Sequence, residues 1–231
     1  MTDTAASTRP SARRANKRTI MRQDILVTAR QIVEEQGVDA LSLRSIARAM
    51  GYSASALYEY YESKEEILEA LYFMGTGGLA LQMLETYENL PSGTSTIDAL
   101  MALGMTYRDY AHANPDLYWL AFSRLQYRPE HGPVMDDALS QTSVGPFLRV
   151  IQEGVANGTL SDVIPPGAMA ISGWSAVHGF VSLELSGHLT FDILAWRTDP
   201  LVERKVQRRD DLFAVLLRTT IGSFVRRPAA S

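Results

Sequence analysis

The chain has 231 residues, 46% of them hydrophobic, and a formal net charge of −4. This length and composition suit one large globular domain or two small ones, each with a real core. Because no run approaches about 20 consecutive apolar residues, we expect no transmembrane helix and no membrane partner. The absence of cysteine excludes a disulfide framework and a thiolate metal site.

Basic charge is concentrated at the N-terminal end of the chain. Residues 1–64 hold ten lysines and arginines against seven acidic residues, a balance of +3, and the remainder has a balance of −7. Between Thr4 and Gln23 there are six basic and no acidic residues: Arg9, Arg13, Arg14, Lys17, Arg18 and Arg22. We predict a disordered basic arm over residues 1–19, because this stretch is polar and lacks periodicity. It is either a solvated tail or an arm that contacts phosphates or a minor groove.

Three helices are predicted next, over residues 20–66. The first runs from about Arg22 to Gln36 and ends at Gly37, with apolar residues at helical spacing: Ile25, Ala29, Ile32 and Val33. The second has its own apolar stripe at Leu43, Ile46, Ala47 and Met50. Ser42 is a plausible N-cap for it, and Gly51 a plausible end. Ser53 caps a third helix, whose buried face holds Leu57 and Tyr61. Two short helices joined by a tight turn describe a helix-turn-helix.

A longer helix follows, from Lys64 towards Leu90. Ser63 and Glu66 have the spacing of a capping box at its start. The run Gly75-Thr76-Gly77-Gly78 lies inside it. Because each glycine in a helix interior costs about 1 kcal/mol relative to alanine, three of them should break or soften the helix. The run is either a hinge between two domains or a site of close packing.

The rest of the chain is predicted to be helical, so the fold class is all-α. No alternating strand pattern of useful length occurs. The remaining helices are expected at about 97–113, 115–125, 134–156 with an interruption near Gly145-Pro146, 166–185 and 201–225. Residues 67–226 would form a larger helical regulatory and dimerisation domain, and residues 227–231 a tail.

The N-terminal pattern resembles the DNA-binding domain of TetR-family transcriptional regulators. The residues that match are Ile25-Leu26, Ala29, Glu35-Gln36-Gly37, Leu43-Arg44-Ser45-Ile46-Ala47, Gly51-Tyr52-Ser53, Ala56-Leu57-Tyr58-Glu59-Tyr60-Tyr61 and Ser63-Lys64-Glu65. Two residues depart from the family pattern, because members often have glycine at the position of Ser55 and phenylalanine at that of Tyr61. The recognition helix differs between members, so the resemblance does not give the operator sequence.

Candidate DNA contacts follow from this pattern. Arg44 opposes the helix dipole at the start of its helix, which makes sense if the side chain reaches a base or a phosphate. Hydroxyl groups can donate to phosphate oxygens, and small side chains allow a helix to lie deep in the groove. The predicted DNA-binding residues are Arg18, Arg22, Arg44, Ser53, Ala54, Ser55, Tyr58, Tyr60 and Lys64. Glu59 is more compatible with a side chain that points to solvent.

The C-terminal part resembles the regulatory domain of a TetR subgroup with a Trp–His–Gly signature. Trp174, His178 and Gly179 stand at the matching region, with Asn114-Pro115 and Tyr118 in an earlier one. The resemblance implies a ligand pocket among helices. The predicted ligand-binding residues are Met83, Tyr118, Trp119, Phe122, Phe147, Trp174 and His178. Each also has a plain structural interpretation, because aromatic residues at helical spacing are usually core.

The last two long helices are predicted to form the dimer interface, through faces that hold small and apolar residues: Ala170, Gly173, Val177, Phe180, Leu212, Val215, Leu216 and Ile221. A two-fold dimer would place two recognition helices in successive major grooves, so the expected operator is palindromic.

The sequence therefore predicts a cytoplasmic bacterial transcription regulator, and a repressor rather than an activator on the family resemblance. Its partners would be double-stranded operator DNA, a small apolar or aromatic effector, and a second copy of the chain. We expect no cofactor, no metal site and no enzymatic activity, because the scattered histidines and the missing catalytic motifs offer no site. Two alternatives remain open: control by a protein partner in place of a small ligand, and, more remotely, an enzyme in the C-terminal domain.

Overall fold

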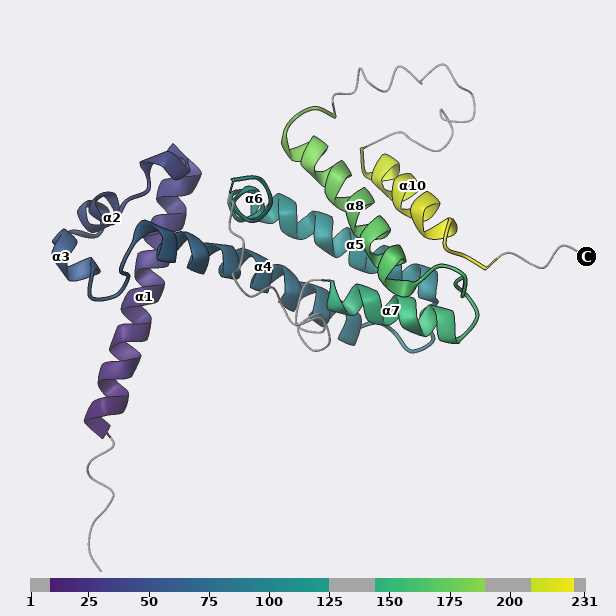
Figure 1. Cartoon of the computed structure of the whole chain (residues 1–231), viewed down its shortest axis with the longest axis horizontal. Coiled ribbons are helices and arrows are strands. Elements are labelled where there is room, and N and C mark those ends of the chain that lie inside the picture. Colours follow the sequence, from purple (N-terminus) through teal and green to yellow (C-terminus); the bar gives the residue numbers. More distant parts are fainter. Residues whose placement is uncertain (1–8, 125–143, 190–208, 227–231) are drawn as a thin grey trace, which may run out of the picture. The chain divides into compact units, whose positions relative to one another are not determined.

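The computed structural model describes residues 9–124, 144–189 and 209–226 (Figure 1). Within these ranges the chain is helical and has no strand, which confirms the all-α fold class. The elements in chain order are α1 (Arg9–Gln36), the 3₁₀-helix η1 (Val38–Ala40), α2 (Leu43–Met50), α3 (Ala54–Leu57), α4 (Lys64–Glu88), α5 (Thr96–Ala113), α6 (Pro115–Trp119), the π-helical turn η2 (Leu120–Arg124), α7 (Gly145–Ala156), α8 (Pro166–Leu185) and α10 (Arg209–Gly222).

The chain divides into two compact units. The first holds the residues up to Gly75 together with the segment that begins at Asp116, and the second holds the rest. The division therefore falls inside α4, whereas the sequence analysis places the domain boundary at residue 66. The segment from Asp116 follows the second unit along the chain but packs with the first, which no local sequence pattern indicates.

Helix α1 is longer than predicted. It begins at Arg9 rather than near Arg22, so residues 9–19 are helical and the prediction of a disordered arm is wrong for them. Pro10 stands in its first turn, where a proline is tolerated because no backbone donor is needed there. Residues 15–20 are all exposed. A helix that is exposed on every side has no apolar stripe, and for this reason periodicity did not reveal it.

The helix ends around α2 form as the sequence predicts. The side chain of Ser42 accepts a hydrogen bond from the backbone N–H of Ser45, and the hydroxyl of Ser45 accepts one in return from the backbone of Ser42. Gly51 ends α2 with a φ of 74°, a left-handed conformation that costs glycine little. Ser53 caps α3 through the N–H of Ala56. These caps fix the short turn between α2 and α3.

The core of the first unit lies among α1, α2, α3 and the start of α4. Its fully buried side chains include Ile25, Ile46, Leu57, Tyr61 and Ile67. Tyr61, at the position where the family often has phenylalanine, is 1% exposed and its hydroxyl donates to the backbone oxygen of Arg22. The buried phenol therefore satisfies its polar group, as a buried hydroxyl must.

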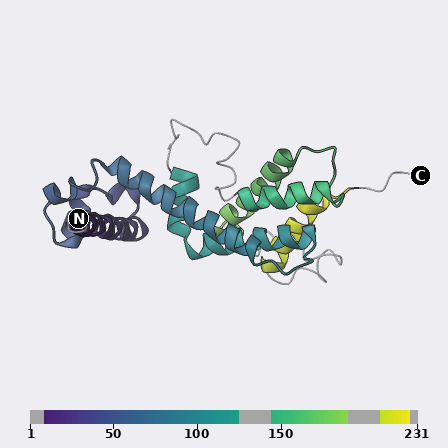
Figure 2. The same cartoon turned by 90° about the horizontal axis from the view of Figure 1, so that it is seen from below.

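The second unit is a helical bundle in which α5, α7, α8 and α10 pack together (Figure 1, Figure 2). Its core includes Leu100, Leu103, Ile151, Val181 and Phe213. Part of the predicted helix over 134–156 and part of that over 201–225 lie outside the described residues, as does the predicted tail at 227–231. The described remainders, α7 and α10, begin at Gly145 and Arg209.

The glycine run does not break α4, which is continuous from Lys64 to Glu88. A Cβ atom at Gly75 would lie 3.2 Å from the Cβ of Leu117, and one at Gly78 would lie 2.6 Å from the hydroxyl oxygen of Tyr110. Two of the three glycines therefore allow close packing, and the expectation of a broken helix is wrong. The hinge interpretation of this run stays a prediction.

By length and composition, α4 is the one helix of the described ranges that could cross a membrane, with a mean hydropathy of 1.3. A core helix of a soluble protein passes the same test. Leu71, Leu79 and Met83 of α4 are buried within the protein. The hydropathy of α4 therefore does not assign it to a membrane.

Candidate nucleic-acid interface and apolar pocket

The outer face of α2 and α3 carries polar, basic and aromatic side chains. Arg44 is exposed near the start of α2, and Ser53, Ser55 and Tyr58 are exposed on and beside α3, with Tyr58 55% exposed. The hydroxyls of Ser53 and Ser55 lie 3.0 Å apart. Hydroxyl and guanidinium donors on one face are the groups that contact phosphates and base edges. This arrangement can read a DNA groove.

Two predicted DNA contacts, one on α3 and one after it, are less accessible. Ala54 and Tyr60 are half-buried and pack against the core of the first unit. Glu59 is exposed, in agreement with the solvent-facing orientation that the sequence favoured. The exposed residues on and after α3 are therefore fewer than the residues predicted there to contact DNA.

Arg22 connects α1 to the end of the helix-turn-helix. Its guanidinium donates to the backbone oxygen of Tyr60 and, over 2.9 Å, to Oε1 of Glu66, and it lies 4.0 Å above the ring of Tyr61. Burial alone would raise the pKa of Glu66, but hydrogen bonds from the backbone of Glu62 and from Arg22 hold that pKa below its ordinary value. Arg22 is thus held by contacts within the first unit and positions the residues after α3.

Arg18 and Lys64 make similar contacts. Arg18 donates to the backbone oxygen of Glu59 over 3.1 Å, and Nζ of Lys64 donates to the backbone oxygen of Val38 over 2.9 Å. Each cation therefore satisfies a carbonyl at the edge of the helix-turn-helix. Arg18 and Arg22, four residues apart on α1, attach the N-terminal extension of that helix to the residues after α3.

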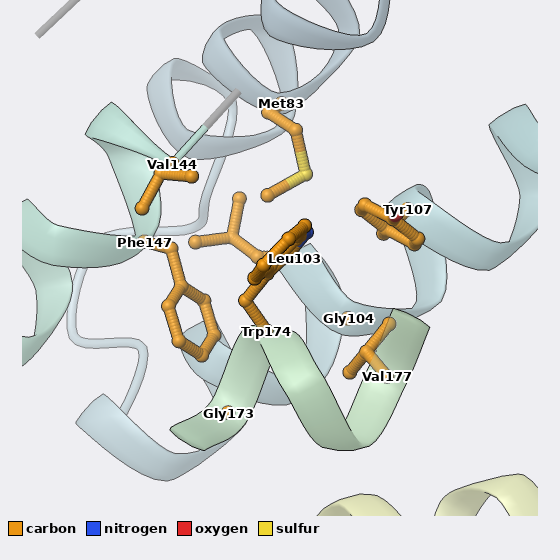
Figure 3. Close-up of a pocket in the computed structure, with 9 residues that line it drawn as sticks. All are labelled: Met83, Leu103, Gly104, Tyr107, Val144, Phe147, Gly173, Trp174 and Val177. Carbon is orange, nitrogen blue, oxygen red and sulfur yellow. The ribbon is translucent and has the colours of Figure 1, made fainter. Parts of the chain in front are cut away.

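An apolar pocket lies in the second unit (Figure 3). Helices α4, α5, α7 and α8 supply its walls. The lining residues are Met83, Leu103, Gly104, Tyr107, Val144, Phe147, Gly173, Trp174 and Val177.

Two glycines shape the pocket wall. A Cβ atom at Gly173 would lie 2.9 Å from two ring atoms of Phe147, and one at Gly104 would overlap the side chain of Leu217. Glycine at these points lets the Phe147 ring pack directly against α8, and Leu217 of α10 against α5. The sequence analysis did not select either glycine as a pocket residue.

One polar pair borders the pocket. The hydroxyl of Tyr107 and Nδ1 of His178 are 3.0 Å apart, and the ring of His178 stacks on that of Trp174 with centroids 5.3 Å apart. Burial lowers the pKa of His178 below its ordinary value, so its imidazole is uncharged at neutral pH. The pair can therefore present a neutral hydrogen-bonding group.

The structure divides the predicted ligand-binding residues between two places. Met83, Phe147 and Trp174 line the pocket, and His178 lies beside it through its contacts with Tyr107 and Trp174. The other three, which belong to the first unit and do not line the pocket, are Tyr118, Trp119 and Phe122. Tyr118 is 2% exposed and its ring contacts those of Trp119 and Phe122. The sequence pattern did not show which of the two units these aromatic residues join.

The predicted lining also lacks residues that the structure supplies: Leu103, Gly104, Tyr107, Val144, Gly173 and Val177. One signal was available for Gly104 and Gly173, because a glycine inside an apolar helix often marks a close approach of neighbouring side chains. Tyr107 lies in the aromatic stretch that the sequence analysis considered, but nothing local distinguishes it from Tyr110, which packs against Gly78.

Most of the residues predicted for the dimer interface are buried within the protomer. Ala170, Val177, Phe180 and Ile221 are each at most 8% exposed. The exposed side of α8 carries a different set of small and apolar residues, without a charge: Ala168, Ile171, Ser172, Ser175 and Leu183. The prediction selected the wrong face of α8, because both faces of this helix are apolar and periodicity cannot tell them apart.

A buried ion pair joins α5 and α8. Arg108 donates to both carboxylate oxygens of Glu184, over 2.8 and 2.7 Å, and His112 lies 2.9 Å from one of them. Burial would raise the pKa of Glu184, but these hydrogen bonds and the nearby positive charge hold it below the ordinary value. Arg108 also lies 5.3 Å above the ring of Phe213 on α10.

Two family models match the chain. One, for bacterial regulatory proteins of the tetR family, covers residues 25–71, and the other, for the tetracyclin repressor-like C-terminal domain, covers residues 100–208. The chain belongs to the TetR family. The helix-turn-helix of this TetR-family regulator is therefore a DNA-binding element, and the predicted resemblance is confirmed. The finer likeness to the Trp–His–Gly subgroup stays a prediction.

Individual proteins agree with this assignment. The TetR-family chain is 26% identical over 191 residues to the HTH-type transcriptional regulator Rv0681 of Mycobacterium tuberculosis. The alignment covers 79% of this chain and 81% of that protein. It is 26% identical over 144 residues to the HTH-type transcriptional repressor KstR2 of Mycolicibacterium smegmatis. This alignment covers 60% of this chain and 66% of that protein.

A solved structure of a protein of unknown function from Rhodococcus sp. RHA1 shares the fold, with a TM-score of 0.70, 21% identity, and coverage of 89% of this chain and 95% of that one. Rv0681 and KstR2 are both named as transcription regulators, the class of protein that the sequence analysis expected.

Proposed function

We propose that this TetR-family regulator is a dimeric repressor that binds a palindromic operator and is released by a small apolar effector. The observation that supports it best is the presence of two separate features in one chain: an exposed polar face on α2 and α3, and an apolar pocket in the second unit. The relative KstR2 is named a repressor, which favours repression over activation.

The DNA-reading role rests on Arg44, Ser53, Ser55 and Tyr58, whose side chains are exposed on the outer face of α2 and α3. Ala54 contributes by its small size, which leaves room for close approach to a base pair. Arg18, Arg22, Tyr60 and Lys64 are proposed to hold the shape of this face, since their side chains contact other parts of the first unit. The same four side chains can also contact DNA phosphates while they hold the shape of this face.

The dimer is proposed to form through the exposed side of α8. A helix face that lacks charge and includes Ile171 at 65% and Leu183 at 47% exposure is costly to leave in water. Val215 of α10 is 39% exposed. A two-fold contact through these helices would present two recognition elements to successive major grooves.

The test of the function is selection of bound fragments from sheared genomic DNA of the source organism by the purified full chain. A palindromic sequence should be enriched. Arg44→Ala should then weaken operator binding by about 10- to 100-fold, the value of one base contact, with an unchanged melting temperature. The matched control is Arg149→Ala, which removes the same charge from an exposed position on α7. Equal losses for both variants would remove Arg44 from the reading surface.

A further inference from the structure

The N-terminal part of α1 is a helical extension of the DNA-binding unit. We call it the basic extension and define it as residues 9–18. At a rise of about 1.5 Å per residue, it is about 14 Å long. Figure 1 shows this end of α1, in purple, running past α3 and beyond the other helices of the first unit. Residues 15–18 are exposed, so this part of the extension contributes surface, and not core, to the unit.

The charge of the basic extension has one sign. Its basic residues are Arg9, Arg13, Arg14, Lys17 and Arg18. The chain has no acidic residue between Thr4 and Gln23 that could neutralise them. Arg9, Arg13 and Lys17 follow one another at intervals of four, a spacing at which like charges repel along a helix and lower its stability. A row of phosphates replaces this repulsion by attraction. The pattern therefore suits a polyanion as the partner.

Two contacts hold α1 next to the DNA-reading face. Arg18 donates to the backbone oxygen of Glu59 over 3.1 Å, and Arg22 donates to that of Tyr60. Both carbonyl groups directly follow Tyr58, which is 55% exposed at the end of α3. The cations of the basic extension are therefore carried by a helix that is fixed beside the recognition surface, and double-stranded DNA is the polyanion that this surface meets.

We propose that the basic extension binds the phosphate backbone of DNA outside the bases that α3 reads, and that it does so as a helix and not as a flexible arm. Because DNA rises about 3.4 Å per base pair, the extension spans about four base pairs. An anionic membrane is a less suitable polyanion, since surface helices bind lipid through an apolar face and the apolar side chains of RPSARRANKR are only proline and alanine. The proposal rests on the proposed function for the operator of its first test, but it needs neither an effector nor repression.

The first test compares two duplexes that hold the selected operator. One duplex ends at the outermost base pairs of the palindrome, and the other continues for about ten further base pairs on each side, more than the extension spans. Fluorescence titration of the full chain over a series of NaCl concentrations gives the affinity and its salt dependence. The longer duplex should bind at least about tenfold more tightly at low salt, and each added phosphate contact should steepen the slope of log K against log salt by about 0.9. Equal affinities and slopes for the two duplexes would overturn the proposal.

A double variant locates this preference in the basic extension. Arg13→Gln/Lys17→Gln removes two charges and keeps good helix-forming residues. It should lose most of the preference for the longer duplex, with a slope that is shallower by about 0.9 for each lost phosphate contact. The control Arg149→Gln/Arg226→Gln removes two charges from exposed positions in the second unit and should keep the preference. Equal losses in the two double variants would reduce the effect to net charge and refute a contact by the extension.

A proline substitution distinguishes a helix from a flexible arm. Asn16 is exposed within the basic extension, and Asn16→Pro breaks α1 there while every charge remains. The preference for the longer duplex should fall, because the cations no longer follow one helical track. Asn16→Ala keeps the helix and should bind both duplexes as the natural chain does. Full preference in the proline variant would show that a flexible arm is sufficient and that the helical contact is wrong.

A duplex of random sequence separates this proposal from the proposed function. Phosphate contacts carry no sequence information, so Arg13→Gln/Lys17→Gln should make the salt dependence shallower on random DNA as well, even where selection yields no palindrome. An absent palindrome would contradict only the proposed operator, whereas an unchanged slope on random DNA would contradict the phosphate contact. Vesicles of anionic lipid test the other polyanion. Loss of vesicle binding in the double variant, with unchanged affinity for every duplex, would assign the extension to a membrane surface and refute its role on DNA.

Discussion

The guanidinium of Arg30 holds the carboxylate of Asp116 with two parallel hydrogen bonds, of 2.7 Å from Nε and 3.0 Å from Nη2. Arg30 lies near the C-terminal end of α1, and Asp116 opens the segment that returns to the first unit after α5. The side chain of Asp116 is only 6% exposed. A planar pair of this kind fixes both distance and orientation, so α6 is attached to α1 of the DNA-binding unit. Helix α5, which lines the pocket, precedes α6 directly in the chain.

Replacement of Arg30 should therefore destabilise the protein. Arg30→Met leaves a nearly buried carboxylate without its partner and should lower the free energy of unfolding by about 2–4 kcal/mol, below the cost for a fully buried pair because Arg30 is 31% exposed. Asp116→Asn should cost less, and a double-mutant cycle in urea should give a coupling energy of at least about 1 kcal/mol. The exposed Arg48→Met serves as the control and should have little effect. Additive single effects would show that the two side chains act independently.

A conservative change at Arg22 distinguishes positioning from charge. Arg22→Lys keeps the positive charge but cannot bond the Tyr60 backbone oxygen and Glu66 together in the same planar geometry. We expect operator affinity to fall by about tenfold and the melting temperature to fall with it. Were Arg22 only a phosphate contact, the lysine would retain most of the affinity and all of the stability, and this result would contradict the positioning role.

The glycines of α4 should respond in opposite directions. Gly77→Ala places a Cβ where no atom lies within 4 Å, so better helix propensity should raise stability by up to about 1 kcal/mol. Gly78→Ala places a Cβ 2.6 Å from the Tyr110 hydroxyl and should lower stability, because buried Tyr110 must move. Thermal unfolding of the two variants is the measurement. Stabilisation by both substitutions would show that Gly78 is not needed for the approach of Tyr110.

The Arg108–Glu184 pair should make stability depend on acid pH. The pKa of Glu184 is lower in the folded state than its ordinary value of 4.5, so the unfolded chain binds the proton more readily. The stabilisation is complete above the ordinary pKa and is lost as the pH falls through the folded pKa. Glu184→Gln should therefore cost about 3 kcal/mol at pH 7 and progressively less as the pH falls below 4.5, measured by urea unfolding. A cost that does not change with pH in this range would exclude this origin.

Local sequence determined the features of this chain that depend on neighbours along the backbone. The Ser42 cap, the left-handed Gly51 and the Ser53 cap each follow from residues within four positions, and all three form as expected. The order of these signals also identified the family. Such features need no knowledge of distant contacts, because a helix end is stabilised by its own side chains.

Tertiary structure decided the rest. Tyr107 borders the pocket while Tyr118 joins the other unit, although both lie in one aromatic stretch, because packing and not periodicity places them. The burial of Val177 and the exposure of Ile171 likewise depend on which side of α8 meets its neighbours. Residues 9–19 form a helical stretch without an apolar stripe. Arg18 within this stretch and Arg22 just beyond it anchor α1 through contacts to residues about forty positions away. A helix with two apolar faces, or with none, carries no local signal of what it contacts.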